Sequence, residues 1–341
     1  MSSAPSADVV TPPVAWPDVD VIVPVINEEQ HLREAVEHIM GSDYPGTMRI
    51  VLALGPSTDG TDVIAAELAS EHASLTCVEN PSGATPAALN RALAVSSSPV
   101  VVRVDAHGFV PRSYITDAVR ILVETGAANV GGVMAAQGRT AFEQAVARAM
   151  NSRLGIGNAP FHVGGEAGPA ESVYLGVFRR DALARVGGFD ESFSRAQDWE
   201  LNHRLREAGE VVWFDPRLQV GYRPRRDMRA LARQFHGSGR WRREVAGQHS
   251  GTVSLRYLAP PVTTLLVVVG LVVSVVGLVL RSPLAWAGAL PASYLVGVCV
   301  ASVAVGRGLP LRSRLWLPLV VICMHLSWGL GFIRGAATRR S

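Results

Sequence analysis

The stretch VVVRVDAH, residues 100–107, decides the fold of this 341-residue chain. A short apolar run of β-branched residues predicts a buried strand. Asp105 and His107 follow it one residue apart, so their side chains point to the same side of an extended chain. In an open α/β sheet, ligands bind at the carboxyl ends of the strands, where this pair suits a divalent cation held against a diphosphate. The alternative, a strand end capped by a turn-forming Asp with a surface His, stays open on these residues alone.

Strand and helix patterns alternate around this stretch. They predict strands at 20–25, 49–54, 75–78 and 100–104, with helices at 27–40, 62–72 and 85–94. This alternation predicts an α/β fold with a doubly wound, mostly parallel sheet. The less regular second half predicts helices at 111–125 and 198–208, and strands at 130–135, 173–178 and 211–214. Residues 153–169 are Gly-rich and aperiodic, which predicts a mobile loop.

The carboxyl-terminal part predicts membrane helices. The chain is 48% hydrophobic and 18% charged, which is typical of a soluble domain joined to a membrane segment. Charged residues are absent from 258–280 and 282–306, and 315–333 carries only His325 as a titratable group. Each window approaches or exceeds the roughly 20 residues that cross a bilayer. Three spans are the simplest count.

The arginines bear on the orientation of these helices. Nine arginines lie between 217 and 243, ahead of the first window, and Arg307, Arg312 and Arg314 follow the second. Because cytoplasmic loops are enriched in basic residues, this placement predicts a cytoplasmic α/β domain. With three spans, however, residues 334–340 and their three arginines would lie on the non-cytoplasmic side of the membrane, against the positive-inside rule. Whether the third segment spans, re-enters or lies at the interface therefore stays open.

We expect five segments: a disordered leader (1–17), an α/β domain (18–225), an Arg-rich interfacial segment (226–257), about three membrane helices (258–335) and a tail (336–341). The leader lacks a basic n-region and an apolar core, so no signal peptide is predicted. All 32 basic residues are arginine, which excludes a Lys-based phosphate loop and Schiff-base chemistry. The three cysteines are far apart, which predicts reduced, unpaired packing residues.

Six motifs, in this order, resemble those of a family-2 glycosyltransferase with a GT-A fold. They are VIVPVINEE (21–29), GPSTDGTD (55–62), ALNRA (88–92), RVDAHG (103–108), VGGFDESF (186–193) and QDWELNHRLREAG (197–209). The resemblance covers roughly residues 18–245 and is strongest to the membrane-bound glucosyltransferases of succinoglycan and other exopolysaccharide assembly, whose metal motif is also Asp-Ala-His. The hydrophobic tail is similar too.

The resemblance implies roles for the residues around the diphosphate. Asp105 and His107 match the Asp-x-Asp metal motif, with Mg²⁺ or Mn²⁺ as the expected cation. Asp198 matches the catalytic base, with Gln197 where the family usually has Glu; the alternative is that Asp198 only caps its helix. Gly188 and Asp190 match the loop on the acceptor side.

The expected nucleotide site is less complete. Pro24, Asn27 and Glu28 match positions that contact the base and ribose, and helix capping is the alternative for the latter two. Leu54-Gly55 stands where the family presents an acidic pair that reads the base, so base recognition is in doubt. Asp59 is kept, with turn formation as its expected task. Arg103 either offsets diphosphate charge or pairs inside the domain.

A later element, RQFHGSGRW (233–241), resembles the Gln-x-x-Arg-Trp element of processive relatives with altered spacing. On that interpretation Trp241 stacks on a sugar and Arg240 meets a phosphate. The same Arg-rich amphipathic segment is typical of a helix that lies on anionic lipid, and this interfacial interpretation is favoured.

The resemblance implies an inverting, metal-dependent hexosyltransferase at the cytoplasmic face of the inner membrane. Its expected partners are a nucleotide-diphosphate sugar, foremost a UDP-sugar, a lipid-linked or polysaccharide acceptor, and the lipid bilayer, but no nucleic acid. A nucleotidyltransferase is disfavoured because the Gly-rich triphosphate loop and its Lys are absent. A non-catalytic carbohydrate-binding or scaffold paralogue stays as the alternative, supported by Leu54-Gly55.

Overall fold

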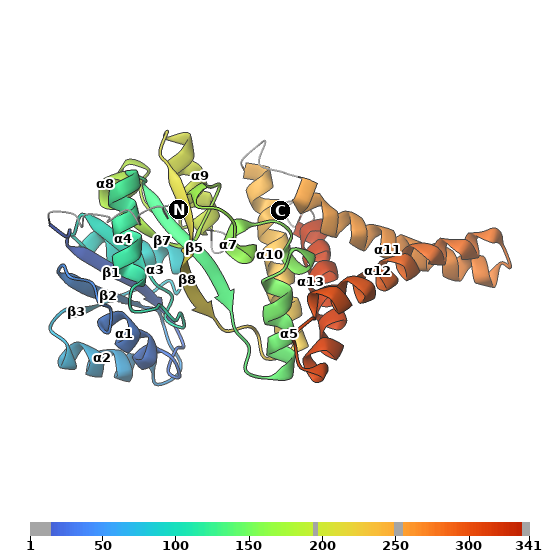
Figure 1. The fold of residues 1–341 in the computed structure, drawn as a ribbon, viewed down its shortest axis with the longest axis horizontal. Helices are drawn as coiled ribbons and strands as arrows, with labels where there is room; N and C mark the ends of the chain where they lie inside the picture. The colour runs from blue at the N-terminus through green and yellow to red at the C-terminus, as the bar shows by residue number, and fades with distance from the viewer. Residues whose placement is uncertain (1–14, 194–196, 249–254, 336–341) are drawn as a thin grey trace, which may run out of the picture.

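The computed structural model describes residues 15–193, 197–248 and 255–335, and its described part contains one mixed eight-stranded sheet (Figure 1). The strand order is β3-β2-β1-β4-β7-β5-β8-β6. The strands are β1 (Val19–Val25), β2 (Met48–Leu54), β3 (Leu75–Glu79), β4 (Val100–Arg103), β5 (Asn129–Ala136), β6 (Gly168–Pro169), β7 (Tyr174–Arg179) and β8 (Val212–Tyr222).

The first four strands form the expected parallel, doubly wound half. β1 pairs in parallel with β2 and β4, and β2 pairs in parallel with β3. β7 then runs antiparallel to both β4 and β5, whereas β5 and β8 are parallel. The carboxyl ends of β1–β4 therefore meet at one edge of the sheet, which positions the site described below.

Helices cover both faces of the sheet because successive strand residues point to opposite sides. Val21 packs into one core and Ile22 into the other. The first core is closed by α1 (Leu32–Met40), α2 (Thr61–Glu71) and α4 (Tyr114–Thr125). The second is closed by α3 (Thr85–Val95), α8 (Arg180–Arg185) and α9 (Gln197–Glu207).

A third core joins the sheet domain to the carboxyl-terminal helices. It contains buried residues of α5 (Ala141–Met150), α10 (Met228–Gln248), α12 (Ala289–Val305) and α13 (Leu311–Gly335). α11 (Leu255–Val279) and α12, linked by the 3-10 turn Pro283–Gly288, extend away from the rest of the molecule, whereas α10 and α13 run across their base (Figure 1). Three segments, 257–279, 283–305 and 311–335, are long and apolar enough to cross a membrane.

The structure corrects three boundary predictions. The first helix begins at Leu32 and not at Asn27, whose backbone is left-handed (φ 54°) and cannot start a helix. Residues 153–169 are not one irregular loop, because they form α6 (Arg153–Ile156), α7 (Pro160–Val163) and β6. The strand predicted at 211–214 begins at Val212 and continues to Tyr222, past Asp215 and Pro216.

The predicted five-segment division stays a prediction. The leader through residue 14 and the tail from residue 336 lie outside the described residues. Within the described part, the predicted interfacial segment holds α10 as a continuous helix.

Candidate active site

A cavity of about 200 Å³ lies at the carboxyl ends of β1, β3 and β4. This is the edge at which ligands bind in open α/β sheets. Six of the predicted site residues line it: Pro24, Glu28, Arg103, Asp105, His107 and Gln197. The structure thus brings the metal motif and the first strand's loop into one chamber.

Arg103 connects the predicted catalytic base to the metal motif. Its guanidinium, only 4% exposed, donates to a carboxylate oxygen of Asp198 and, at 3.0 Å, to Asp105 Oδ1. The two carboxylates are 24% and 20% exposed, so each keeps a face open to a ligand. Of the two roles expected for Arg103, pairing inside the domain is the one present in this structure.

Asp198 lies in the first turn of α9, where the partial positive charge of the helix end favours a carboxylate. Its side chain reaches Arg103, so its contacts extend beyond its own helix. Glu200, which follows it, is buried and paired with Arg204, whose guanidinium also holds the carbonyls of Val186 and Gly188. Within this pair of carboxylates, Asp198 faces the cavity residues and Glu200 supports the preceding loop.

His107 of the predicted metal motif has the kind of supporting contact that metal-binding imidazoles usually have. His107 Nδ1 lies 2.8 Å from Glu28 Oε1, and the hydrogen bond with Glu28 raises the pKa of His107 against the lowering effect of burial. A carboxylate on one ring nitrogen fixes the tautomer and leaves Nε2 to face a cation. The described residues contain no group of three or more His, Cys, Asp or Glu side chains placed for a metal. The donor set therefore fits a cation that takes two protein ligands and completes its shell with phosphate and water.

Asn27 and Asp59 do not line the cavity but tie two strand-end loops together. Asn27 Oδ1 accepts from Thr58 N–H at 2.8 Å, and Asn27 N–H donates to Ser57. Asp59 accepts from the Thr61 hydroxyl and from its backbone N–H, and the hydroxyl contact is the main reason that the pKa of Asp59 lies below its ordinary value. The Asn27 bonds, together with those from Glu28 N–H to the Thr61 hydroxyl and from Glu29 N–H to Asp59, hold the segment that carries Glu28 against the loop after β2.

The predicted acceptor-side loop is clamped to α3. Asn90 of α3 exchanges hydrogen bonds with the backbone of Phe189, at 2.8 Å and 2.9 Å, and Gly188 leaves no room for a side chain beside Asn90 Oδ1. Asp190 Oδ1 accepts from Ser192 N–H at 2.8 Å. Gly188 and Asp190 lie outside the cavity lining, and their acceptor-side role stays a prediction.

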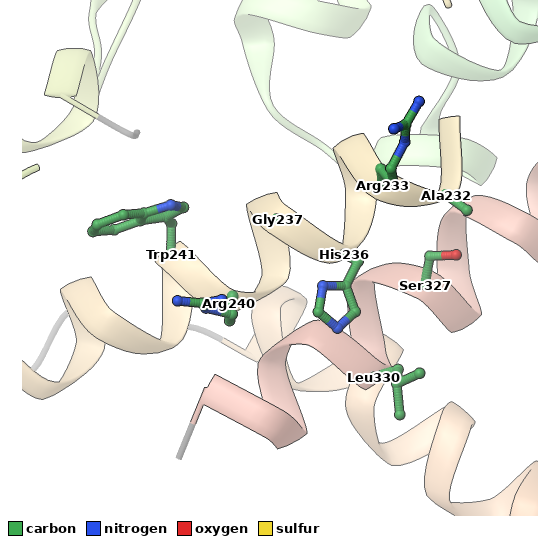
Figure 2. A pocket seen from close by; sticks show the side chains of 8 residues that line it. All are labelled: Ala232, Arg233, His236, Gly237, Arg240, Trp241, Ser327 and Leu330. Atoms are coloured by element: carbon green, nitrogen blue, oxygen red, sulfur yellow. The ribbon is translucent and has the colours of Figure 1, made fainter. Parts of the chain in front are cut away.

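Arg240 and Trp241 lie in a different place. They line a groove of about 510 Å³ between α10 and α13, together with Arg233, His236, Ser327 and Leu330 (Figure 2). The structure does not bring them to the cavity at the sheet edge.

Sequence reasoning missed the loop after β3, which supplies Asn80 and Gly83 to the cavity. The sequence could have indicated this loop, because a loop that follows a parallel strand reaches the same sheet edge.

The structure also shows what lies where the family's acidic pair is missing, at Leu54-Gly55. A Cβ on Gly55 would lie 3.1 Å from the side chain of Ile26, which itself lines the cavity. An apolar side chain thus packs at the place where the family presents acidic groups.

Comparisons with known proteins agree with this arrangement. A sequence model described as glycosyl transferase family 2 matches residues 20–187. Succinoglycan biosynthesis protein ExoA from Rhizobium meliloti (strain 1021) is 32% identical over 319 residues, which cover 92% of this chain and 93% of that protein. Among solved structures, mannosyltransferase PcManGT from Pyrobaculum calidifontis, in complex with GDP-Man and Mn²⁺, has a TM-score of 0.60 at 20% identity, covering 98% of this chain and 91% of that one. TarS residues 1–349 from S. aureus, in complex with UDP, has a TM-score of 0.46 at 18% identity, covering 80% and 88%.

Proposed function

The chain belongs to glycosyltransferase family 2 and is a glycosyltransferase with a GT-A fold, and from this premise we propose an inverting, metal-dependent reaction at the cytoplasmic face of the inner membrane. In this reaction a sugar passes from a nucleotide-diphosphate donor, foremost a UDP-sugar, to a lipid-linked or polysaccharide acceptor. The observation that carries the proposal is the Arg103 bridge between Asp198 and Asp105.

Arg103 contacts the residues proposed for both parts of the reaction, the deprotonation of the acceptor and the departure of the diphosphate. Asp198 is the proposed general base, whose carboxylate takes the proton of the acceptor hydroxyl as that oxygen attacks the anomeric carbon. The diphosphate leaves from the opposite face, on the side of Asp105 and His107. Because Arg103 is buried and contacts both carboxylates, it positions them relative to each other before substrate binds.

Asp105 and His107 would hold the cation, with Glu28 orienting the imidazole. A divalent cation at this place supplies Lewis-acid stabilisation of the negative charge that grows on the diphosphate. The cation proposed is Mg²⁺ or Mn²⁺, since a carboxylate with an imidazole suits either. The fold neighbour PcManGT was determined in complex with a nucleotide sugar, GDP-Man, and with Mn²⁺.

The acceptor proposal rests on the membrane helices and on the relative. A helical membrane segment packed against the sheet domain favours an acceptor that is itself held at the membrane. The relative's name assigns it to succinoglycan biosynthesis, which is polysaccharide assembly. A lipid-linked or growing polysaccharide acceptor fits both observations.

The test measures transfer from labelled UDP- and GDP-sugars in membranes that contain the full chain, with and without Mg²⁺ or Mn²⁺. We expect transfer from at least one donor, abolished by chelation. Asp198→Asn should lower the rate by about 10²- to 10⁴-fold, the usual contribution of a general base, while donor binding is kept. Asp181→Asn, at an exposed carboxylate in the first turn of α8, is the matched control and should transfer normally.

Two results would overturn parts of the proposal. Normal transfer by Asp198→Asn would remove the assignment of the base. Failure of every donor to bind would favour the alternative of a non-catalytic carbohydrate-binding paralogue, for which the Leu54-Gly55 replacement is the supporting feature.

A further inference from the structure

The helix α13 contacts α5, α6 and α10 in turn along its length. Near its start, Ser313 Oγ donates to Gln144 of α5 at 2.8 Å. At its centre, His325 Nε2 lies 2.7 Å from the carbonyl oxygen of Leu154 in α6. Near its end, Gly331 lies directly against the carbonyl oxygen of His236 in α10. A helix that crosses a bilayer leaves the domain on one side of the membrane, and α13 does not leave it.

The contacts with α11 and α12 lead to the same conclusion. Early in α13, Leu317 lies 3.4 Å from a Cβ built on Gly306, the residue directly after α12. Late in α13, Gly329 packs against the carbonyl group of Pro260 and the hydroxyl of Thr264, in the first part of α11. Both neighbours lie at the end of the α11–α12 hairpin that joins the sheet domain.

The length of α13 makes this placement decisive. From Leu311 to Gly329 a helix rises ~27 Å, at ~1.5 Å per residue. A membrane-crossing α13 would by then stand beside the far end of the hairpin, near Arg281. Instead it lies across the hairpin's base, as Figure 1 shows for the two pairs of helices.

The exposed apolar surfaces of α11 and α13 also indicate that only α11 is mostly surrounded by lipid. α11 exposes apolar side chains at about two of every three positions: Val262, Leu265, Leu266, Val268, Val269, Leu271, Val272, Val275 and Val276. It buries only a narrow stripe: Pro261, Thr264, Val267, Gly270 and Gly277. α13 exposes apolar side chains on one face: Leu311, Leu315, Trp316, Leu319, Leu330 and Ile333. The protein buries 39% of the most apolar window in the third segment, against 22% and 17% in the other two. α11 therefore needs lipid on most of its circumference, whereas α13 needs it on one face.

The partner of α13 is an Arg-rich helix. α10 runs parallel to it, with Met228 beside Cys323 and Arg240 beside Gly335, and it exposes Arg229, Arg233, Arg240 and Arg243. Arginine near the centre of a membrane span is among the costliest residues to insert. If α13 crossed the bilayer, its second half would carry these arginines into the hydrocarbon.

We propose that only α11 and the 283–305 segment cross the bilayer, and that α10 and α13 lie together on the leaflet that faces the sheet domain. Their shared groove then receives the headgroups of anionic phospholipids (Figure 2). Arg233 and Arg240 supply positive charge, His236 and Ser327 supply polar groups, and Trp241 and Leu330 supply apolar surface. That this leaflet is the cytoplasmic one rests on the proposed function, whereas the count of two spans does not.

This arrangement places both ends of the chain on one side of the membrane. The arginines at 334, 339 and 340 then accompany those of 217–243 and 307–314, as the positive-inside rule requires. Between residues 257 and 306 the sequence has a single charged residue, Arg281. It lies at the far end of the hairpin, on the opposite side of the membrane from the other arginines.

Accessibility in intact spheroplasts tests the span count. In a full-length chain with Cys77→Ser, Cys299→Ser and Cys323→Ser, the single change Ser282→Cys reports the hairpin tip, and epitope tags report the two termini. We expect an impermeant maleimide to label position 282 from outside, and protease added outside to spare both tags. Tags on opposite sides would overturn the two-span proposal. Both tags outside, with position 282 inside, would keep two spans and overturn the cytoplasmic location in the proposed function.

The lipid assignment is tested on the purified full chain in bilayers of phosphatidylcholine and phosphatidylglycerol, with spin-labelled lipids to measure relative association. Arg233→Gln with Arg240→Gln should reduce the preference for phosphatidylglycerol by about 5-fold for each arginine removed. Arg33→Gln with Arg120→Gln, on α1 and α4, removes equal charge away from the groove and should leave the preference unchanged. An equal loss in both pairs, or none in the first, would overturn the assignment of the groove.

Discussion

At the residue scale, the candidate site depends on one buried guanidinium group, that of Arg103, which contacts two carboxylates. Arg103 stands at the end of β4, and its side chain contacts both Asp105 and Asp198, almost a hundred positions apart in the chain. The sequence marked all three residues but not their contact. These two ion pairs give Arg103, two residues before Asp105, a role in positioning both a proposed base and a proposed metal ligand.

The Glu28–His107 contact leads to a prediction about the cation. Glu28→Gln removes the carboxylate that orients the imidazole, and loss of such a supporting contact typically weakens metal affinity by about 10- to 100-fold. We expect the Mn²⁺ concentration for half-maximal transfer to rise by that factor, with the rate restored at saturating Mn²⁺. Direct titration of Mn²⁺ by electron paramagnetic resonance provides the second measurement.

Glu29→Gln is the matched control, because its carboxylate is exposed beside Gly60 and does not line the cavity. It should leave the Mn²⁺ dependence unchanged. If the two variants behave alike, Glu28 does not support the cation site.

At the element scale, two glycines allow α10 and α13 to pack backbone to backbone. A side chain at Gly239 would overlap the carbonyl oxygen of Trp328, and one at Gly331 would overlap that of His236. This close approach makes α10 part of a helix pair and not an isolated amphipathic helix. The interfacial interpretation of the Arg-rich segment is therefore incomplete without α13.

The packing of α10 on α13 can be tested by replacing glycine with valine at two positions of α10, in two separate variants. Gly239→Val forces the helices apart, and overpacking of this kind costs about 1–3 kcal/mol or more. We expect the melting temperature of the detergent-purified chain to fall by several degrees and trypsin to cleave faster within α10.

Gly247→Val makes the same change in the same helix where nothing lies within 4 Å of a new Cβ. It should be neutral or slightly stabilising, since valine is a better helix former than glycine. A similar melting temperature for both variants would contradict close packing at Gly239.

At the scale of the whole molecule, a buried carboxylate holds the amino-end edge of the sheet, opposite the cavity. Asp20 of β1 accepts from the backbone N–H groups of Ser97 and Ser98, both at 2.7 Å, and pairs with Arg49 and Arg180. Burial acts to raise the pKa of Asp20, but the hydrogen bonds from Ser98 and Ser97 outweigh it, so the pKa lies below its ordinary value. The same residue thus links β1, β2, the approach to β4, and α8.

A depressed pKa in the folded state makes this contribution depend on pH. The stabilisation is fully present above the unfolded value of about 3.9 and is lost as the pH falls through the lower folded value. Asp20→Asn should cost about 1–3 kcal/mol near neutrality, because buried donors lose a charged acceptor. Differential scanning fluorimetry from pH 7 to pH 3 should show the gap to the wild type closing below about pH 4.

Asp18→Asn, at an exposed position two residues earlier, is the control and should not change the melting temperature at either pH. A gap for Asp20→Asn that stays constant across the whole range would show that its charge does not stabilise the fold.

The fold could be predicted to the extent that it depends on local pattern. The strands up to residue 104 were placed within one residue, because parallel strands that are buried on both faces are continuous apolar runs in the sequence. The boundaries that failed depend on distant contacts. Asn27 is left-handed where its side chain and backbone bond to residues 57 and 58, and 153–163 forms short helices where it packs near α13.

The sequence by itself determined the α/β class, the motif residues and the apolar length of the last three helices, because each follows from residues that are neighbours in the chain. Only the tertiary structure decided what these parts contact: Arg103 between two carboxylates, Glu28 on His107, and α13 across the base of a hairpin. The physical reason is that composition and periodicity report which surface a segment must bury. They do not report which of several apolar surroundings, protein or lipid, buries it.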